Sequence, residues 1–252
     1  MIKLSFLTLM RIATLMVACV LVGCGGASST VNPLTPTRVI AFGDAFSTVD
    51  SSGYATYSVN TSETNATVAS RIASIYGFTL KAVASSSAVI ASGTAYSYAA
   101  GTATSSATAT QISNYLANNT PGSKDLFIIT AGTQDIISAA PTNDTTAIAT
   151  AATALTSAIQ SLTNAGAQYV TVMQPINVAR TPPFLALNGV RPAGANAASN
   201  ANAQALSYDS GTACLSFSCL LSTKLNAAYP ATSSHQPILL VDYRDELRNL
   251  QV

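Results

Sequence analysis

An acid and a hydroxyl follow the first predicted strand, in Phe42-Gly43-Asp44-Ala45-Phe46-Ser47. A serine hydroxyl attacks a carbonyl group only when an adjacent base, usually histidine, removes its proton. The sequence has one histidine, His235, which precedes the last predicted strand. A strand of about six residues is about 20 Å long, so His235 is expected in a solvated loop at the sheet edge opposite this turn. Ser47 is therefore expected to be a loop or capping hydroxyl, and an alternative nucleophile only if another base exists.

Two further segments of the sequence bear on the same site. They are Tyr98-Ala99-Ala100-Gly101-Thr102-Ala103-Thr104 and Ala131-Gly132-Thr133-Gln134-Asp135. Together with the turn after Phe42, and with the segment from Asn164 to Pro175 followed by Thr181-Pro182, they resemble the sequence blocks of the GDSL/SGNH ester-hydrolase family. The blocks occur in the family's order, and the resemblance covers roughly residues 38 to 250.

The resemblance implies acyl-transfer chemistry. In this family a serine after the first strand attacks the ester, and a histidine in a carboxyl-terminal Asp-x-x-His block is its base. The serine N–H, a glycine N–H and an asparagine side chain hold the oxyanion. By resemblance Gly101 is the oxyanion glycine, and Gln134 stands at the asparagine position with one extra methylene. Ala45 stands at the nucleophile position, and losing such a nucleophile typically costs about 10⁴- to 10⁶-fold in rate.

The acidic residues are expected to serve the structure of the site. Asp44 and Asp135 are expected to hydrogen-bond loop backbone and so fix the geometry around Ala45. Asp242 ends the last predicted strand, but no Asp-x-x-His follows it, so it is expected to be a strand-end or helix-cap residue. By comparison with the family, the domain is expected to be truncated at its carboxyl terminus.

Alternating strand and helix patterns must position these groups. Apolar runs predict five strands, and periodic apolar stripes predict five helices. The strands are 38–42, 78–84, 125–131, 168–173 and 237–242, and the helices are 63–76, 111–118, 145–165, 220–228 and 243–250. Residues 85–105 are low in complexity and are expected to form a loop. The alternation predicts one three-layer α/β/α domain with a five-stranded, mainly parallel sheet, and the resemblance implies the SGNH-hydrolase, flavodoxin-like arrangement.

The composition excludes several kinds of partner. The 252 residues are 8% charged and 48% hydrophobic, with a formal net charge of +1. A chain so close to neutrality has no basic surface for nucleic acid and no basic run for a membrane surface. There is no histidine cluster or second cysteine pair for a metal, and no cofactor is expected.

The amino terminus reads as a targeting signal. Lys3 and Arg11 precede the apolar run from Ile12 to Val22, which is too short to span a bilayer. The run ends in Leu21-Val22-Gly23-Cys24, which resembles a bacterial lipobox. The resemblance implies a lipoprotein signal peptide over residues 1–23, acyl chains (palmitate or similar) on Cys24, a flexible tether over residues 24–37, and sorting to the outer membrane. An ordinary secretory signal is the alternative.

Two cysteines remain in the mature part. Cys214 and Cys219 enclose four residues, and an oxidising compartment predicts a disulfide between them. Two free buried thiols are the alternative.

Two functions of different class follow. Ala45 and the missing Asp-x-x-His favour an impaired family member that serves as a binding or scaffold protein. It would be anchored in the bacterial cell envelope through its acyl chains, with an acyl ester or a glycan as ligand and with protein partners unspecified. The alternative is an active hydrolase of lipid or carbohydrate esters that uses another serine, or a fragment of such an enzyme.

Overall fold

The structure is a computed structural model of the chain that describes residues 33–56, 66–181, 184, 197–208, 213–231 and 236–242. The chain divides into Met1–Leu34 and Thr35–Val252, and the second unit holds all the elements below. The predicted signal peptide, Cys24, most of the tether, His235 and the helix predicted at 243–250 lie outside the described residues. No helix in the described part of the chain is long and apolar enough to cross a bilayer.

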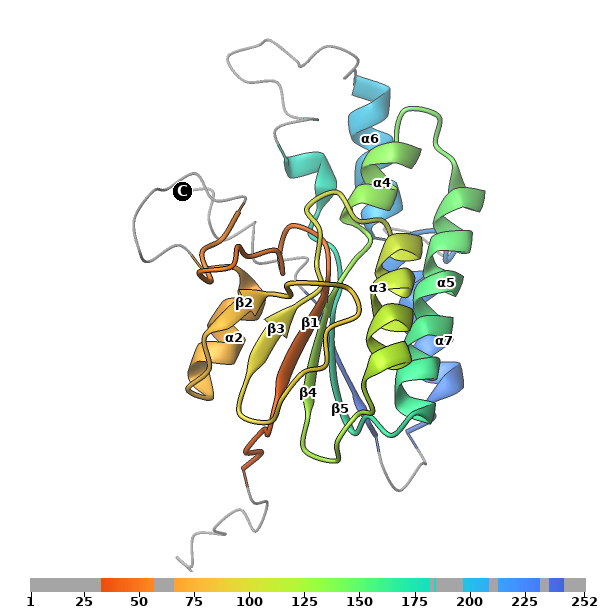
Figure 1. Cartoon of the computed structure of the whole chain (residues 1–252). Coiled ribbons are helices and arrows are strands. Elements are labelled where there is room, and N and C mark those ends of the chain that lie inside the picture. Colours follow the sequence, from red (N-terminus) through yellow and green to blue (C-terminus); the bar gives the residue numbers. More distant parts are fainter. Residues whose placement is uncertain are drawn as a thin grey trace, which may run out of the picture. The chain divides into compact units, whose positions relative to one another are not determined.

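Six parallel strands form the centre of this unit (Figure 1). They are β1 (Val39–Gly43), β2 (Leu80–Ala82), β3 (Ala95–Ser97), β4 (Leu126–Thr130), β5 (Tyr169–Met173) and β6 (Ile238–Val241). Their order across the sheet is β2-β3-β1-β4-β5-β6, and every neighbouring pair is parallel. After β1 the chain adds β2 and β3 on one side of that strand, and then adds β4, β5 and β6 on its other side. The β1/β4 boundary is therefore the topological switch point, where open α/β sheets bind ligands.

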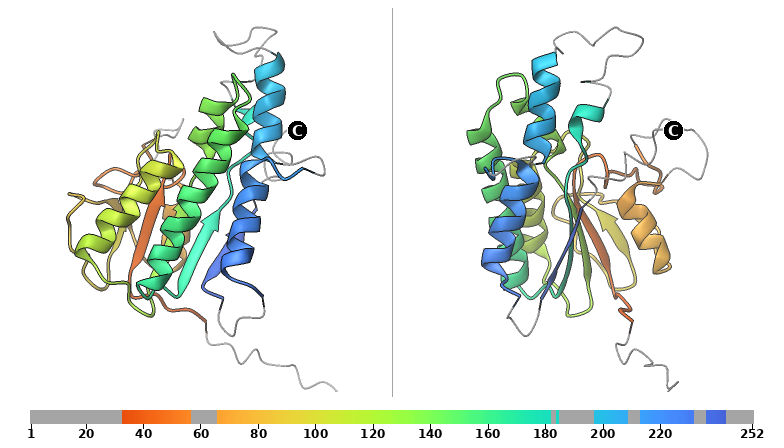
Figure 2. Two further views of the ribbon diagram at one scale, coloured as in Figure 1. Left: turned by 90° about the vertical axis from the view of Figure 1, so that its right-hand side faces the viewer. Right: turned by 180° about the vertical axis from the view of Figure 1, so that it is seen from behind.

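Helices cover both faces of the sheet. They are α2 (Val68–Ile75), α3 (Ser105–Asn118), α4 (Thr133–Ala139), α5 (Thr145–Asn164), α6 (Ala197–Ser207) and α7 (Phe217–Ala228), with a 3₁₀ turn η1 (Val178–Arg180). One face carries α2, and the other carries α3, α5 and α7 (Figure 2). Beyond the carboxyl ends of the strands, α6 packs against α4 and η1 (Figure 1). This is the expected three-layer α/β/α arrangement.

Oxygen-bearing side chains begin four of these helices. Thr67, Thr104, Asp144 and Ser216 each accept a backbone N–H from the first turn of α2, α3, α5 and α7 respectively. Such caps satisfy a donor that has no partner within the helix. They explain why Ser/Thr-rich segments of modest hydrophobicity still form well-defined helices.

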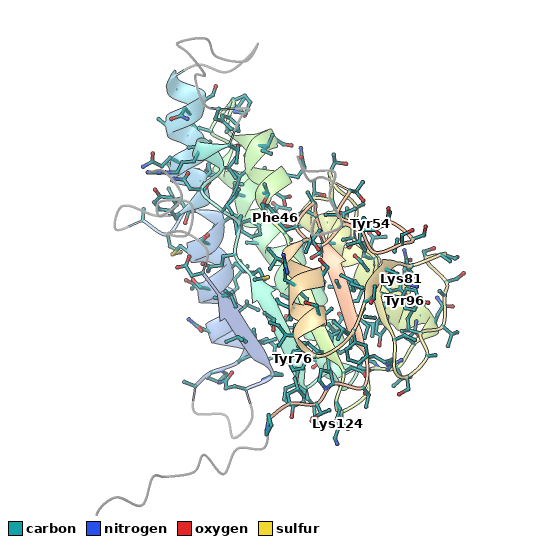
Figure 3. All side chains as sticks on the ribbon, turned by 90° about the vertical axis from the view of Figure 1, so that its left-hand side faces the viewer. Phe46, Tyr54, Tyr76, Lys81, Tyr96 and Lys124 are labelled. Atoms are coloured by element: carbon teal, nitrogen blue, oxygen red, sulfur yellow. A yellow bond between two sulfur atoms is a disulfide. The ribbon has the colours of Figure 1, made fainter. Side chains whose placement is uncertain are left out.

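An ion pair fixes the opposite, amino-terminal edge of the sheet. Arg38 precedes β1, and its Nε donates to Asp125 Oδ2 at 3.0 Å just before β4. Asp125 is fully buried and also accepts from the Thr37 hydroxyl at 2.8 Å. The pair aligns the two central strands in their Val39–Leu126 register. Lys124 marks this edge in Figure 3, and Phe46 marks the carboxyl edge.

The fold class and all five expected strands are confirmed, but the sheet has six strands. The expectation of a loop over residues 85–105 was wrong at β3, which lies between β1 and β2. Its three residues, Ala-Tyr-Ser, are too few and too polar to form a recognisable apolar run, and hydrogen bonding from both neighbours supplies the missing stability. Two helices, α4 and α6, were not expected, and α3 begins at Ser105 rather than at Gln111 because Thr104 caps it.

Candidate active site

The carboxyl ends of β1 and β4 meet at a turn that requires glycine. Gly43 ends β1 with φ +125°. A Cβ at this position would lie 1.7 Å from the Thr130 carbonyl oxygen of β4. No other residue fits so close an approach of two backbones, so Gly43 lets the chain turn out of the sheet directly beside β4.

The Gln111 side chain of α3 hydrogen-bonds both backbone polar groups of Gly43. Its Oε1 accepts the Gly43 N–H at 2.6 Å, and its Nε2 donates to the Gly43 carbonyl at 3.1 Å. The Ala100 N–H also donates to that carbonyl, at 2.9 Å. Gln111 is a positioning residue that the sequence analysis did not identify. Its only signal is its place among the inward-facing positions of α3, one residue before the buried Ile112.

Ala45 stands half-buried immediately after this turn. Its methyl group offers no nucleophile. Its N–H has no acceptor among the described residues, and the same holds, within that part of the chain, for the N–H of Gly101. These are the two backbone donors that the family resemblance assigns to the oxyanion. The Ala100–Gly43 hydrogen bond joins the two loops that carry them.

Ser47, the alternative nucleophile, is fully buried. Its hydroxyl shares a hydrogen bond of 2.9 Å with the Thr130 hydroxyl, and its carbonyl accepts from the Ser97 hydroxyl at 2.6 Å. These bonds tie the loop after β1 to β4 and β3. A hydroxyl so enclosed cannot reach an ester without opening the loop.

Two polar side chains at the start of α4 make different contacts: Gln134 bonds within its own helix, and Asp135 links α4 to α3. Gln134, at the asparagine position, donates from Nε2 to the Ser138 hydroxyl at 3.4 Å, one turn along its own helix. Asp135 accepts both the Ser105 N–H and the Ser105 hydroxyl at 2.8 Å, and so joins α4 to the start of α3. Burial raises the pKa of Asp135, and the two Ser105 hydrogen bonds oppose that rise.

Asp44 is the one acid buried at the switch point, with 2% of its surface exposed. Its Oδ1 accepts the Phe46 N–H at 3.2 Å. Its Oδ2 has no hydrogen-bond partner among the described residues. Burial raises the pKa of Asp44; the Phe46 N–H and the nearby Thr130 and Thr133 hydroxyls oppose the rise.

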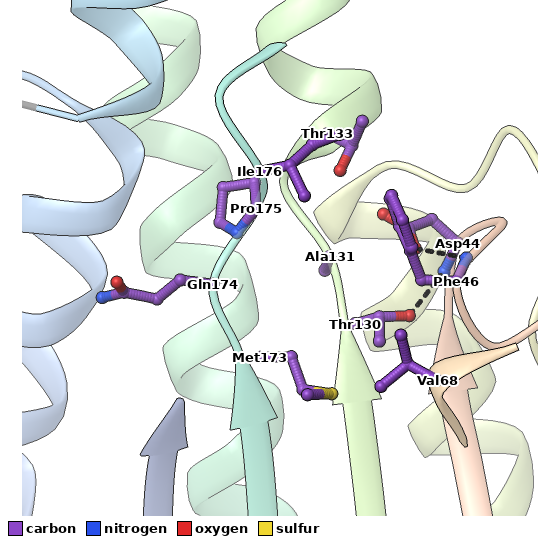
Figure 4. Close-up of a pocket in the computed structure, with 10 residues that line it drawn as sticks. All are labelled: Asp44, Phe46, Val68, Thr130, Ala131, Thr133, Met173, Gln174, Pro175 and Ile176. Atoms are coloured by element: carbon purple, nitrogen blue, oxygen red, sulfur yellow. Dashed lines mark hydrogen bonds between the residues drawn. The ribbon is translucent and has the colours of Figure 1, made fainter. Parts of the chain in front are cut away.

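A small pocket opens beside Asp44 (Figure 4). Its volume is about 50 Å³. Asp44 and Phe46 form one side, Pro175 and Ile176 the opposite side, and the Thr133 hydroxyl points inward from α4. Gln174 contributes backbone only, because its side chain points away toward α7 and donates to the Ser218 carbonyl at 3.2 Å. The complete lining is Asp44, Phe46, Val68, Thr130, Ala131, Thr133, Met173, Gln174, Pro175 and Ile176.

Among the described residues, the other candidates Asp242, Cys214 and Cys219 do not line this pocket. Asp242 directly follows β6, and His235 is outside the described residues. Cys214 and Cys219 are joined by a disulfide at the start of α7, with Cα atoms 5.5 Å apart. Within the described ranges, no three histidine, cysteine or acidic side chains gather as metal ligands would.

Comparison with known proteins identifies a protein family that matches this chain. The model of the GDSL-like lipase/acylhydrolase family matches residues 39–218, which is more than half of the chain. No curated protein sequence matches. Among solved structures, a member of the lipolytic protein G-D-S-L family from Veillonella parvula DSM 2008 is similar at 13% sequence identity, over 84% of this chain and 81% of its own, with a TM-score of 0.43.

Proposed function

The chain belongs to the GDSL-like lipase/acylhydrolase family, and we propose that it is a lipid-anchored member that has lost ester hydrolysis and serves as a binding or scaffold protein. One observation carries the proposal. The position after Gly43-Asp44 presents the methyl group of Ala45, while the hydroxyl of Ser47, two residues further on, is fully buried and hydrogen-bonded.

The groups around Ala45 support retention of the backbone donors without the reaction. Two backbone N–H groups, of Ala45 and Gly101, stay without acceptors among the described residues. Gly43 and Gln111 still hold the turn in place. A site of this kind polarises a carbonyl oxygen and so favours ligands that carry an ester or an amide. Without a nucleophile and base, donors of this kind retain about 10³- to 10⁴-fold acceleration over water, which is weak beside a complete triad.

The proposed location rests on the amino-terminal sequence. Leu21-Val22-Gly23-Cys24 supplies the acylation site, and the Gly- and Ser-containing residues after it supply a tether. The mature domain would then face the cell envelope, attached to a membrane, outer in a two-membrane host, through its acyl chains. Ligands available there include acyl esters and glycans.

The test is hydrolysis of p-nitrophenyl acetate and butyrate by purified protein. The parent should not exceed the residual acceleration that such donors alone allow, far below that of a complete triad. Ala45→Ser should gain little, because triad members act as a unit and a serine without its base is nearly inert. A fluorophosphonate, which labels activated serines covalently, should produce no mass shift in either protein.

Two results would overturn the proposal. Robust turnover by the parent, lost in Ser47→Ala and accompanied by phosphonylation of Ser47, would make Ser47 the nucleophile. Mapping the labelled peptide separates this outcome from a loss caused merely by unfolding of the variant. Robust turnover by Ala45→Ser alone would show that a functional base is present.

A further inference from the structure

We propose that the free edge of β6 binds the same edge of a second copy of this chain, so that the two sheets continue into one another across a two-fold axis at Leu239. The inference does not depend on the proposed function, because β6 contributes no residue to the pocket beside Asp44. It starts from a difference between the two edges of the sheet, which are formed by β2 and β6.

The β2 edge is covered by the loop that follows β1. The Ala82 N–H donates to the Asp50 carbonyl at 2.9 Å, and a Cβ added to Gly53 would lie 2.8 Å from the Leu80 carbonyl oxygen. At the opposite edge, β6 pairs with β5 and with no other strand among the described residues. An uncovered strand edge binds other strands unless charged side chains, a proline or a bulge prevents it.

The hydrogen bonds to β5 identify which backbone groups of β6 face away from the sheet. The Val170 N–H donates to the Pro237 carbonyl at 2.8 Å, so Pro237 and every second residue after it turn polar groups toward β5. The N–H and C=O groups of the alternate residues, Ile238 and Leu240, therefore point outward. Within the part of the chain that the structure describes, none of these outward groups has a hydrogen-bond partner.

The side chains of β6 give this edge an uncharged, apolar character. The strand reads Ile-Leu-Leu-Val and contains no charged residue or proline. Ile238 and Leu240 pack against the hydrophobic core. Successive side chains of a strand point to opposite faces, so Leu239 lies on the other face of the sheet, where 61% of its surface is exposed. The edge thus lacks the side chains that normally prevent strand pairing.

A second copy supplies a strand that matches this edge. A two-fold axis perpendicular to the sheet at Leu239 runs two β6 strands antiparallel and places Ile238 of each copy opposite Leu240 of the other. These outward-facing residues would exchange N–H···O=C bonds, and the two Leu239 residues would form a non-hydrogen-bonded pair with Cα atoms about 4.5 Å apart. Every cross-strand pair is then apolar, so pairing removes apolar surface from water on both faces.

The charge of the chain favours a second copy as the occupant. The strand offers no charged side chain to a charged partner, and a formal net charge of +1 produces little repulsion between two copies. Stable interfaces bury about 1,200–2,000 Å². A strand of 4 residues is a short contact by that standard, so the expected dimer is weak and forms as the concentration rises.

The first experiment is sedimentation velocity on the full-length protein in density-matched detergent, with micelles in excess over protein. The parent should pass from monomer to dimer with rising concentration. Leu239→Lys places like charges directly opposite each other and should raise the dimer Kd at least tenfold, while the melting temperature is retained because the side chain is exposed. Val89→Lys, at an apolar residue that is 79% exposed outside the sheet, is the matched control and should dimerise like the parent.

Cysteine trapping tests the register of the pair. Cα atoms about 4.5 Å apart lie within the range that a disulfide can bridge. Leu239→Cys should therefore form an intermolecular disulfide on mild oxidation, visible as a dimer in a non-reducing gel. Val89→Cys, which is equally accessible to oxidant, should form little.

Three results would overturn the inference. A parent that stays monomeric at every concentration would show that the edge does not bind a second copy, and capture of an apolar strand peptide of different sequence by that monomer would assign the edge to another protein. Undiminished dimerisation of Leu239→Lys would place the contact elsewhere on the surface. Equal trapping of Leu239→Cys and Val89→Cys would mean that the disulfides record random collision.

Discussion

Replacing Gly132 with alanine should destabilise the domain through two separable effects. Gly132 precedes α4 with φ +105°, and a non-glycine residue in this left-handed region costs about 1–2 kcal/mol. An added Cβ would also lie 2.5 Å from Cε1 of the Phe217 ring. Phe217 is fully buried in the core at the start of α7, so the ring has little room to move, and overpacking of this kind costs about 1–3 kcal/mol. The free energy of unfolding should fall by about 2–5 kcal/mol.

Gly77 provides the matched control. It has φ +79°, and a Cβ there would meet nothing within 4 Å, so Gly77→Ala measures the backbone cost alone. Both changes reduce the entropy of the unfolded chain alike, and this contribution cancels in the comparison. Urea unfolding followed by circular dichroism should give Gly132→Ala an additional loss of about 1–3 kcal/mol. Equal losses in the two variants would refute the steric part of the reasoning, as would a failure of Phe217→Leu to recover part of the loss in the double variant.

Three further predictions concern charge, cross-linking and anchoring. Burial raises the pKa of Asp44 in the folded state, so the folded protein binds the Asp44 proton more tightly than the unfolded chain does, and the parent loses stability as pH rises above about 4, the pKa of the unfolded chain. Asp44→Asn should therefore become increasingly stable relative to the parent over that range. Urea midpoints of parent and variant that move in parallel from pH 4 to 8 would contradict this. Reducing the Cys214–Cys219 disulfide, which closes a loop with a sequence separation of 5, should lower the free energy of unfolding by about 2 kcal/mol, and alkylation of unreduced, denatured protein should label neither cysteine. Cys24→Ser should shift the protein from the detergent phase to the aqueous phase in detergent partitioning, and unchanged partitioning would exclude the anchor.

The strands were predictable from the sequence where both faces of the sheet are buried, because such strands must consist of apolar residues. The strands β1 and β4 are buried at every position, and such strands require continuous apolar runs that are visible in sequence. The strand β3 lacks this signal. Its Ala95, Tyr96 and Ser97 become a strand because β1 and β2 supply partners on both sides. Its pairing is thus a property of the assembled sheet and not of the segment.

The site was predictable only in part, for a similar reason. Family-like blocks pointed to Asp44, Gly101, Gln134 and Asp135, and in the structure Asp135 accepts the Ser105 N–H and hydroxyl. Gln111 was missed because its partner, Gly43, lies 68 residues away. A polar residue on a helix gives no local sign that it will bracket a distant peptide. The unpaired Oδ2 of Asp44 is likewise visible only when all its neighbours are placed.

The turn after β1 also explains how an alanine can occupy the position that the family resemblance assigns to the nucleophile without disturbing the fold. The contacts that shape the turn come from its neighbours. The Gly43 peptide is held by Gln111, the Ser47 hydroxyl is bonded to Thr130, and the Asp44 carboxylate accepts the Phe46 N–H. The Ala45 side chain is half-buried and contributes no hydrogen bond to any of them. A serine hydroxyl at this position would serve the reaction and not the turn, so its absence carries little cost in stability. Under the proposed function, the turn and the Ala45 N–H would persist for binding after the reaction is lost.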